Sequence, residues 1–212
     1  MYLPRHYEVT ELPALHALIE AHPLGTWVLH AGGELVANHI PFLLDPTRGE
    51  FGTLCGHVAR ANPAWEALAP GVPSLVVFQG TDAYVTPSWY AAKQEHGRVV
   101  PTWNYATVHA NGTARAIEDA DWLRAHVSLM SGTQERHESA PWAVTDAPPE
   151  FIEKMLTAIV GIEIPIARLV GKWKVSQNRD EADRQGVIAG LARRGGDAAA
   201  EMAKLVRERK PD

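Results

Sequence analysis

The sequence predicts an α+β protein that is mainly β, with peripheral helices and a helical C-terminal tail. About six segments with strand character follow one another between residues 25 and 118, and their short connections favour antiparallel pairing. Helical patterns precede, interrupt and follow these strands. Such a run of antiparallel strands is typical of a barrel or a sandwich.

The N-terminal part begins with a helix and continues as strands. Apolar residues recur at helical spacing in TELPALHALIEAHP, and Pro23 ends this helix. TWVLHA and ELVANHIPFLLD form a predicted hairpin around Gly32-Gly33, because a glycine pair suits a tight primed turn. FGTLCGHV follows as a third strand, and Pro63 then begins a short helix.

The middle of the chain returns to strands and then to helices. PSLVVFQG and DAYVTPSWY are predicted strands separated by a turn at Gly80-Thr81, and VPTWNYATVHANGTARAIED is a predicted strand pair around Asn111-Gly112. Asp119 or Asp121 caps a helix in DWLRAHVSLM, and a proline pair begins another in PPEFIEKMLTAIV. GIEIPIARLVGKWKV has strand character again.

The tail is predicted to form two helices broken at Gly195-Gly196. Asn178, followed by Glu181, resembles a capping box at the start of the first one. We therefore expect one barrel domain over residues 1–178 and a helical tail over residues 179–212, which packs on the barrel or on a partner subunit.

Composition limits the class of protein. The chain has 212 residues, 46% hydrophobic and 21% charged, with a net charge of −5, as in an ordinary soluble globular protein. No apolar stretch is long enough to span a bilayer and the first residues lack an apolar signal region, so we expect a cytoplasmic protein without a membrane partner. Cys55 is the only cysteine, which rules out an internal disulfide and a zinc site built from cysteines.

The net negative charge argues against a protein whose whole surface binds DNA. Any DNA contact would need a local patch, and one basic run lies between residues 193 and 210. It contains Arg193, Arg194, Lys204, Arg207, Arg209 and Lys210. Cations at the end of a helix are also favoured by the helix dipole, so a solvated helix face is the preferred interpretation of this run.

The familiar catalytic signatures are absent, including the phosphate-binding loop, the dinucleotide fingerprint, the zinc-protease motif and the nucleophile elbow. Polar clusters at strand ends remain. GHVARANPAW places His57, Arg60 and Asn62 before a short helix, where a guanidinium and a helix N-terminus can bind an anion. The alternative is that Asn62 only caps the helix and Arg60 is solvated.

Two further clusters, YVTPSWY and VVPTWNY, place Trp and Tyr beside small polar residues in strands interrupted by proline, as at an edge or a bulge. Trp89 and Trp103 suit either the core or a ligand site. In GKWKVSQN, Lys172 and Lys174 alternate with Trp173, which predicts both lysines on one face of a strand.

Taken together, MYLPRHY, HIPFLL, GHVARANPAW, AYVTPSWY, HGRVVPTWNY, PWAV and GKWKVSQN resemble the PaiB family, described as FMN-binding negative transcriptional regulators. The resemblance runs in order from residue 1 to about residue 191. It implies an FMN-binding split β-barrel related to pyridoxamine-phosphate oxidase, normally a homodimer with its flavin sites at the subunit interface.

The resemblance also implies which residues contact FMN. His57, Arg60 and Asn62 would form the phosphate side, and Trp89, Thr102 and Trp103 would be walls for the isoalloxazine ring. The C-terminal segment, from the same or the other subunit, would contribute a further set. This set is Lys172, Ser176, Gln177 and Asn178.

Three functions remain open from the sequence. The first is an FMN-binding negative transcriptional regulator, and the second is an FMN-dependent oxidoreductase with a nicotinamide donor. The third is a haem-binding split barrel, because the chain has ten histidines, with His57 and His39 as the first ligands to test. No residue is singled out as a general acid or base, and no metal site is predicted.

Overall fold

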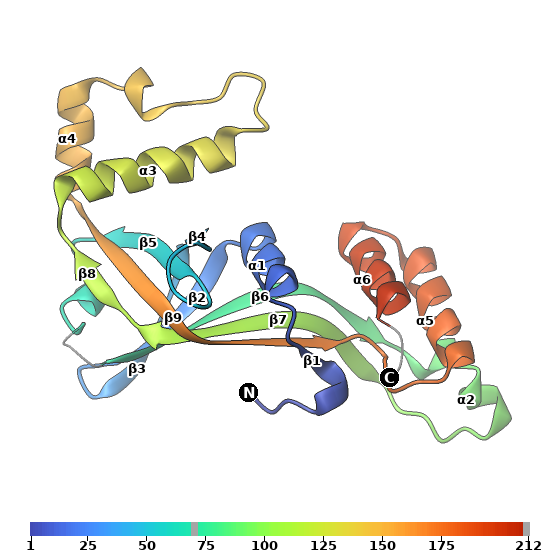
Figure 1. Cartoon of the computed structure of the whole chain (residues 1–212). Coiled ribbons are helices and arrows are strands. Elements are labelled where there is room, and N and C mark those ends of the chain that lie inside the picture. Colours follow the sequence, from blue (N-terminus) through green and yellow to red (C-terminus); the bar gives the residue numbers. More distant parts are fainter. Residues whose placement is uncertain (69–71, 210–212) are drawn as a thin grey trace. The chain divides into compact units, whose positions relative to one another are not determined.

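The computed structural model describes residues 1–68 and 72–209 as a mainly antiparallel sheet accompanied by helices (Figure 1). The strands are β1 (Glu8–Val9), β2 (Leu24–Ala31), β3 (Glu34–Pro41), β4 (Leu43–Asp45), β5 (Thr53–Ala59), β6 (Pro73–Val85), β7 (Thr102–Thr113), β8 (Arg115–Ile117) and β9 (Ile159–Lys174). The α-helices are α1 (Leu12–Ala21), α2 (Ala92–Glu95), α3 (Ala120–Glu135), α4 (Pro149–Thr157), α5 (Glu181–Arg194) and α6 (Asp197–Glu208). The predicted α+β class, mainly β, is confirmed.

The chain forms two compact units. The first unit contains Met1–Ala21, Gln79–His109 and Val170–Asp212, and the second contains His22–Phe78 and Ala110–Leu169. The strands follow the hydrogen-bonding order β3-β2-β6-β7-β9-β5-β4, and both β1 and β8 also pair with β9. β6, β7 and β9 contribute residues to both units. The predicted domain boundary at residue 178 remains a prediction.

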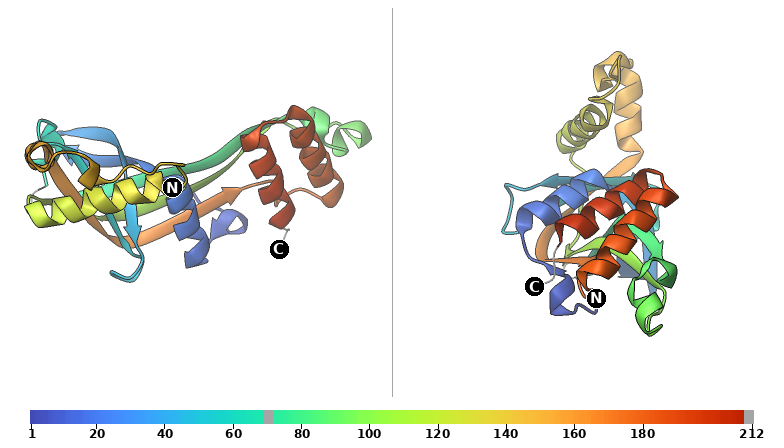
Figure 2. Two further views of the ribbon diagram at one scale, coloured as in Figure 1. Left: turned by 90° about the horizontal axis from the view of Figure 1, so that it is seen from above. Right: turned by 90° about the vertical axis from the view of Figure 1, so that its right-hand side faces the viewer.

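The second unit is built on antiparallel pairs. β2 and β3 form the predicted hairpin, and Gly32 and Gly33 have φ of 60° and 88°, which only glycine adopts readily. Buried side chains such as Trp27 and Phe78 form its core. Asp119 caps α3 by accepting a hydrogen bond from Trp122 N, as predicted. α4 lies next to the first turns of α3 (Figures 1 and 2), and a small apolar cluster joins the two helices.

The first unit contains the C-terminal helices. α5 and α6 pack side by side (Figure 2), and Gly195 and Gly196 form the predicted break between them with φ of 74° and 84°. Arg184, only 2% exposed, donates hydrogen bonds from Nη2 to the carbonyl oxygens of Val206 and Arg209. This buried guanidinium therefore ties α5 to the end of α6.

Two predicted turns are wrong. Gly80-Thr81 lies within β6, and Asn111-Gly112 lies within β7. These glycines serve close packing instead. A Cβ on Gly80 would lie 3.0 Å from Leu18, and one on Gly112 would lie 2.2 Å from the carbonyl oxygen of Pro165. Glycine inside a strand often marks such a close backbone approach.

The predicted cap of the first tail helix is also wrong, because Asp180 rather than Asn178 caps α5, with its carboxylate accepting from Asp183 N at 2.8 Å. The short helix after Asn62 is a single 3-10 turn, Pro63–Trp65, which Asn62 does cap. Within the residues that the structure describes, no helix is both long and apolar enough to cross a membrane.

Candidate functional site

Arg60, predicted to face a phosphate, is bonded to protein groups in the second unit. Its guanidinium donates to the carbonyl oxygens of Thr157 (2.9 Å) and Ile159 (3.2 Å) and to the carboxylate of Glu118 (2.6 Å). The neighbouring pocket, of about 210 Å³, is also lined by Glu153. Arg60 keeps unused donors, and the carboxylates of Glu118 and Glu153 line the same pocket.

The other two residues of this group also have protein partners. Asn62 caps the 3-10 turn and donates from Nδ2 to Asn38 Oδ1 at 2.8 Å. His57 Nδ1 lies 3.2 Å from His126 Nε2, so one ring donates a hydrogen bond to the other. Sequence spacing could not reveal this pair, because His126 lies on α3 and His57 on β5.

The histidine pair makes stability depend on pH. Burial lowers the pKa of His57, and burial with the neighbouring His57 lowers the pKa of His126 to about 4. An unfolded histidine binds a proton below about pH 6.5. Between pH 6.5 and 4 the unfolded state therefore binds more protons than the folded state. The free energy of unfolding falls as the pH is lowered through this window.

We expect the free energy of unfolding to fall by about 3 kcal/mol through His126 as the pH is lowered from 7 to 4. Urea unfolding at several pH values would measure this slope. His126→Gln should flatten it, whereas His39→Gln, at an exposed position of β3, should leave it unchanged. An unchanged slope in the His126 variant would show that this pair does not set the pH dependence.

The structure places the predicted ring walls at separate positions of the first unit. Thr102 and Trp103 are neighbours on β7, and successive side chains of a strand point to opposite faces. Trp103, 55% exposed, contacts Tyr84 edge to face, with ring centroids 5.9 Å apart. Trp89 packs under α5, with Arg194 above its indole at 4.5 Å. A flavin ring that contacts Thr102 cannot also stack on Trp103 from the same face.

The side chains of Lys172 and Gln177 are buried and form hydrogen bonds with other protein groups. Lys172 Nζ donates to the carbonyl oxygen of Tyr2 at 3.0 Å and lies over the ring of Tyr105 at 5.3 Å. The Gln177 side chain accepts from Val175 N and donates to the carbonyl oxygen of Trp173, which fixes the turn before α5. These contacts position the segment before α5, and the role of both residues as FMN contacts remains a prediction.

The remaining predicted residues gather around one small pocket of about 100 Å³, here called the cationic pocket. It is lined by Tyr7, Tyr90, Val100, Pro101, Thr102, Asn104, Lys174, Ser176, Asn178 and Arg179. Thr102, Ser176 and Asn178 come from the predicted set. None of the described lining residues is acidic, so the charges of Lys174 and Arg179 have no carboxylate beside them in the pocket wall.

Lys174 is held at the pocket by fixed acceptors. Its Nζ donates to the hydroxyl of Thr102 and to the carbonyl oxygen of Trp103. Burial lowers the pKa of Lys174, and the charges of Lys172 and Arg179 lower it further. A cation whose neighbours disfavour its charge is stabilised by any anion that binds beside it.

Ser176 has a strained backbone at the same place. Its φ is 66°, the left-handed region that non-glycine residues seldom adopt. Its hydroxyl bonds to Asn104 in a buried pair at 3.0 Å, which holds the turn in this conformation. Such strain is characteristic of ligand sites, because the surrounding structure maintains it at a cost.

Sequence reasoning missed Arg179 as a site residue, and it placed Lys174 on a strand face with Lys172 without including it among the FMN contacts. Lys174 is placed on the same face as Lys172 by strand alternation, and Arg179 directly follows the predicted Asn178. Arg179 lies over the ring of Tyr90 at 4.5 Å, a contact that no local pattern could predict.

The chain thus has a split-barrel fold and a small pocket whose described lining carries two cationic side chains and no acidic one. A family model described as "Putative FMN-binding domain" matches residues 1–168. The chain therefore belongs to this family, and the resemblance to the PaiB family is confirmed. FMN is its cofactor.

Relatives match along nearly the whole chain. The protein from Bacillus subtilis named "Protease synthase and sporulation protein PAI 2" is 32% identical over 209 residues, covering 99% of this chain and 98% of that protein. An uncharacterised protein from Emericella nidulans is 35% identical over 244 residues, with 99% and 97% coverage. The solved FAD and haem binding protein from Mycobacterium smegmatis has a TM-score of 0.61 at 22% identity, covering 87% and 80% of the two chains, which confirms the fold.

The donors of the cationic pocket fit part of FMN. A lysine, an arginine, hydroxyls and an amide suit a phosphate or the polar edge of the isoalloxazine ring. About 100 Å³ is well below the roughly 300 Å³ at which pockets hold a drug-sized ligand. The pocket can therefore hold one anionic group of FMN and not the whole cofactor.

Proposed function

We propose that the protein is an FMN-binding negative regulator of gene expression, and that the cationic pocket holds an anionic group of its flavin. The observation that carries this proposal is the pairing of Lys174 and Arg179 without a carboxylate in the described pocket wall. The regulatory part is supported by the Bacillus subtilis relative, whose name refers to protease synthesis and sporulation.

FMN, when bound, supplies electron transfer. In this assignment Lys174 and Arg179 neutralise the anion, and Thr102 and Asn178 add hydrogen bonds. Ser176, with Lys172 and Gln177 behind it, orients the segment. The alternative site for the phosphate is the group of His57, Arg60 and Asn62. A phosphate bound there would have to replace Glu118 as a partner of Arg60. Trp89 and Trp103 remain predicted ring walls. Assembly into a homodimer is part of the proposal.

The basic tail does not favour regulation through direct DNA contact. Arg194 donates to the carbonyl oxygen of Tyr84 at 2.8 Å, and Arg209 and Lys204 lie near the carboxylates of Glu11 and Glu208. Lys210 lies outside the described residues. We therefore propose that regulation passes through the flavin state or a partner rather than through a DNA-reading helix.

An FMN-dependent oxidoreductase is the second candidate, because one observation favours it. Positive charge near a flavin ring makes reduction easier, and three cations, Lys172, Lys174 and Arg179, lie close enough to influence one another. If the ring edge rather than the phosphate occupies the cationic pocket, these cations favour electron uptake from a nicotinamide donor.

The deciding experiment is an absorbance spectrum of the purified protein, followed by titration with FMN. We expect a flavin spectrum or saturable binding near about 1 μM, and no binding at about 1 mM would contradict the proposal. Repeated oxidation of a nicotinamide donor by the loaded protein would identify an enzyme. DNA affinity that falls steeply between about 50 and 200 mM salt would identify direct DNA binding instead.

A further inference from the structure

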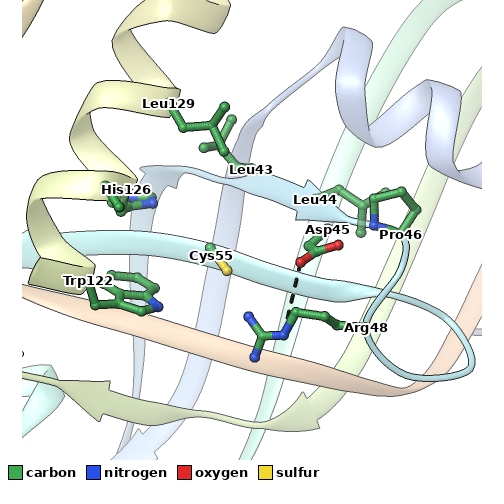
Figure 3. A pocket seen from close by; sticks show the side chains of 10 residues that line it. Leu43, Leu44, Asp45, Pro46, Arg48, Cys55, Trp122, His126 and Leu129 are labelled. Carbon is green, nitrogen blue, oxygen red and sulfur yellow. Dashed lines mark ion pairs between the residues drawn. The ribbon is translucent and has the colours of Figure 1, made fainter.

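A second pocket, of about 440 Å³, lies in the second unit between the β4–β5 strands and helix α3 (Figure 3). Its apolar lining residues are Leu43, Leu44, Pro46, Trp122, Ala125 and Leu129. We call it the apolar pocket. Its volume falls within the range of about 300–1,000 Å³ that is typical of small-molecule sites. None of the FMN-contact residues predicted from the sequence lines it.

The wall of the apolar pocket formed by Trp122 and His126 is held in place by packing and a hydrogen bond. Trp122 lies against the backbone of β9, where a Cβ on Gly161 would be 2.4 Å from the indole ring. His126 stacks on Trp122, with ring centroids 5.0 Å apart and an interplanar angle of 16°, and its Nε2 is bonded to His57. A preformed pocket loses little conformational entropy when it binds a ligand.

The charges beside the pocket are balanced. Arg48 Nη1 lies 2.7 Å from the Glu163 carboxylate, and its Nε lies 4.0 Å from Asp45, as the dashed line in Figure 3 marks. Glu163 is only 1% exposed and also accepts hydrogen bonds from Arg115. Two guanidinium groups thus face two carboxylates, and no net charge remains to attract an ion.

The other two polar lining residues are uncharged at neutral pH. Burial raises the pKa of the Cys55 thiol to about 11, and the pKa of His126 is about 4. A charged ligand would therefore lose its hydration in this pocket without meeting an opposite charge that is not already paired. FMN, with its phosphate dianion, is unsuited to the apolar pocket for the same reason.

We propose that the apolar pocket binds an uncharged, mainly apolar small molecule that carries one amide or phenol group. The polar end of such a ligand both donates and accepts, which matches the Asp45 carboxylate and the remaining donors of Arg48 at one end of the pocket. Leu129, 64% exposed at the rim, would be covered by the ligand. The protein would then sense a second molecule besides FMN.

The test uses the full-length, FMN-loaded protein and Nile red, an uncharged dye whose fluorescence rises in apolar surroundings. We expect saturable binding of one dye per chain. Ala125→Trp, which fills the pocket, should weaken it at least about tenfold, whereas Ser128→Trp on the same helix but outside the lining should not. Unchanged FMN affinity and circular dichroism in both variants would show that the fold is kept.

Competition identifies the ligand class. Acetanilide, an uncharged aromatic amide, should displace the dye, and the benzoate anion of similar size should not. Dye binding that survives Ala125→Trp, or equal displacement by both competitors, would overturn the proposal. Displacement by added FMN would also overturn it. So would a change of molecular mass in light scattering for Ala125→Trp, because that result would assign this face to contact between copies of the chain.

Discussion

Replacing Lys174 with methionine is expected to weaken FMN binding about 10- to 100-fold. Methionine keeps the length of the side chain but removes the ammonium, and a hydrogen bond to a charged group contributes about 1.5–3 kcal/mol. Thr102 also loses the cation that its hydroxyl contacts. Fluorescence titration of FMN with the purified variant measures the change directly.

The matched control is Lys93→Met, because Lys93 is an exposed lysine of the first unit whose Nζ donates to the Ser88 hydroxyl at 3.2 Å and does not line the cationic pocket. Its FMN affinity should equal that of the unmodified protein. Arg60→Ala tests the rival site in the second unit. A large loss in Arg60→Ala together with normal binding in Lys174→Met would place the phosphate at Arg60 and contradict our assignment.

Two glycine-to-alanine substitutions in helices are expected to change stability in opposite directions. Alanine normally stabilises a helix interior by about 1 kcal/mol relative to glycine. In α3, a Cβ on Gly132 would meet nothing within 4 Å, so Gly132→Ala should gain roughly this amount. In α5, a Cβ on Gly186 would lie 1.8 Å from the carbonyl oxygen of Trp89. Gly186→Ala should therefore destabilise the protein by about 1–3 kcal/mol.

Urea unfolding of the two variants, followed by circular dichroism, measures both changes on one scale. The clash at Gly186 involves backbone, which cannot rotate away as a side chain can. A stabilising effect of Gly186→Ala would mean that α5 does not approach the backbone at Trp89 as closely as the structure places it.

Much of the fold follows from local patterns, and the exceptions have a common cause. The Gly32-Gly33 turn, the Asp119 cap and the Gly195-Gly196 break are set by residues that act on their immediate neighbours. Gly80 and Gly112 belong to strands because of contacts with distant segments, Leu18 and Pro165. A single sequence does not distinguish a glycine needed for a turn from one needed for close packing.

In the candidate site, too, some residues could be predicted from the sequence and others only from the tertiary structure. The resemblance led to Thr102, Ser176 and Asn178, which the structure brings to one pocket. It also grouped Thr102 with Trp103, although strand alternation sends them to opposite faces. The partners of His57 and Arg60, which are His126 and Glu118, lie far along the chain, so only the tertiary structure could reveal them.

The buried Arg184 limits how far the chain can be shortened from its C-terminus. The family model ends at residue 168, yet Lys174 and Ser176 follow it, and Arg184 in turn needs the carbonyl oxygens of Val206 and Arg209. A fragment that ended at residue 168 would lack Lys174. One that ended at Gly195 would leave the Arg184 guanidinium without its carbonyl partners from α6 and Arg209. A fragment that keeps both the cationic pocket and the partners of Arg184 therefore has to extend to residue 209.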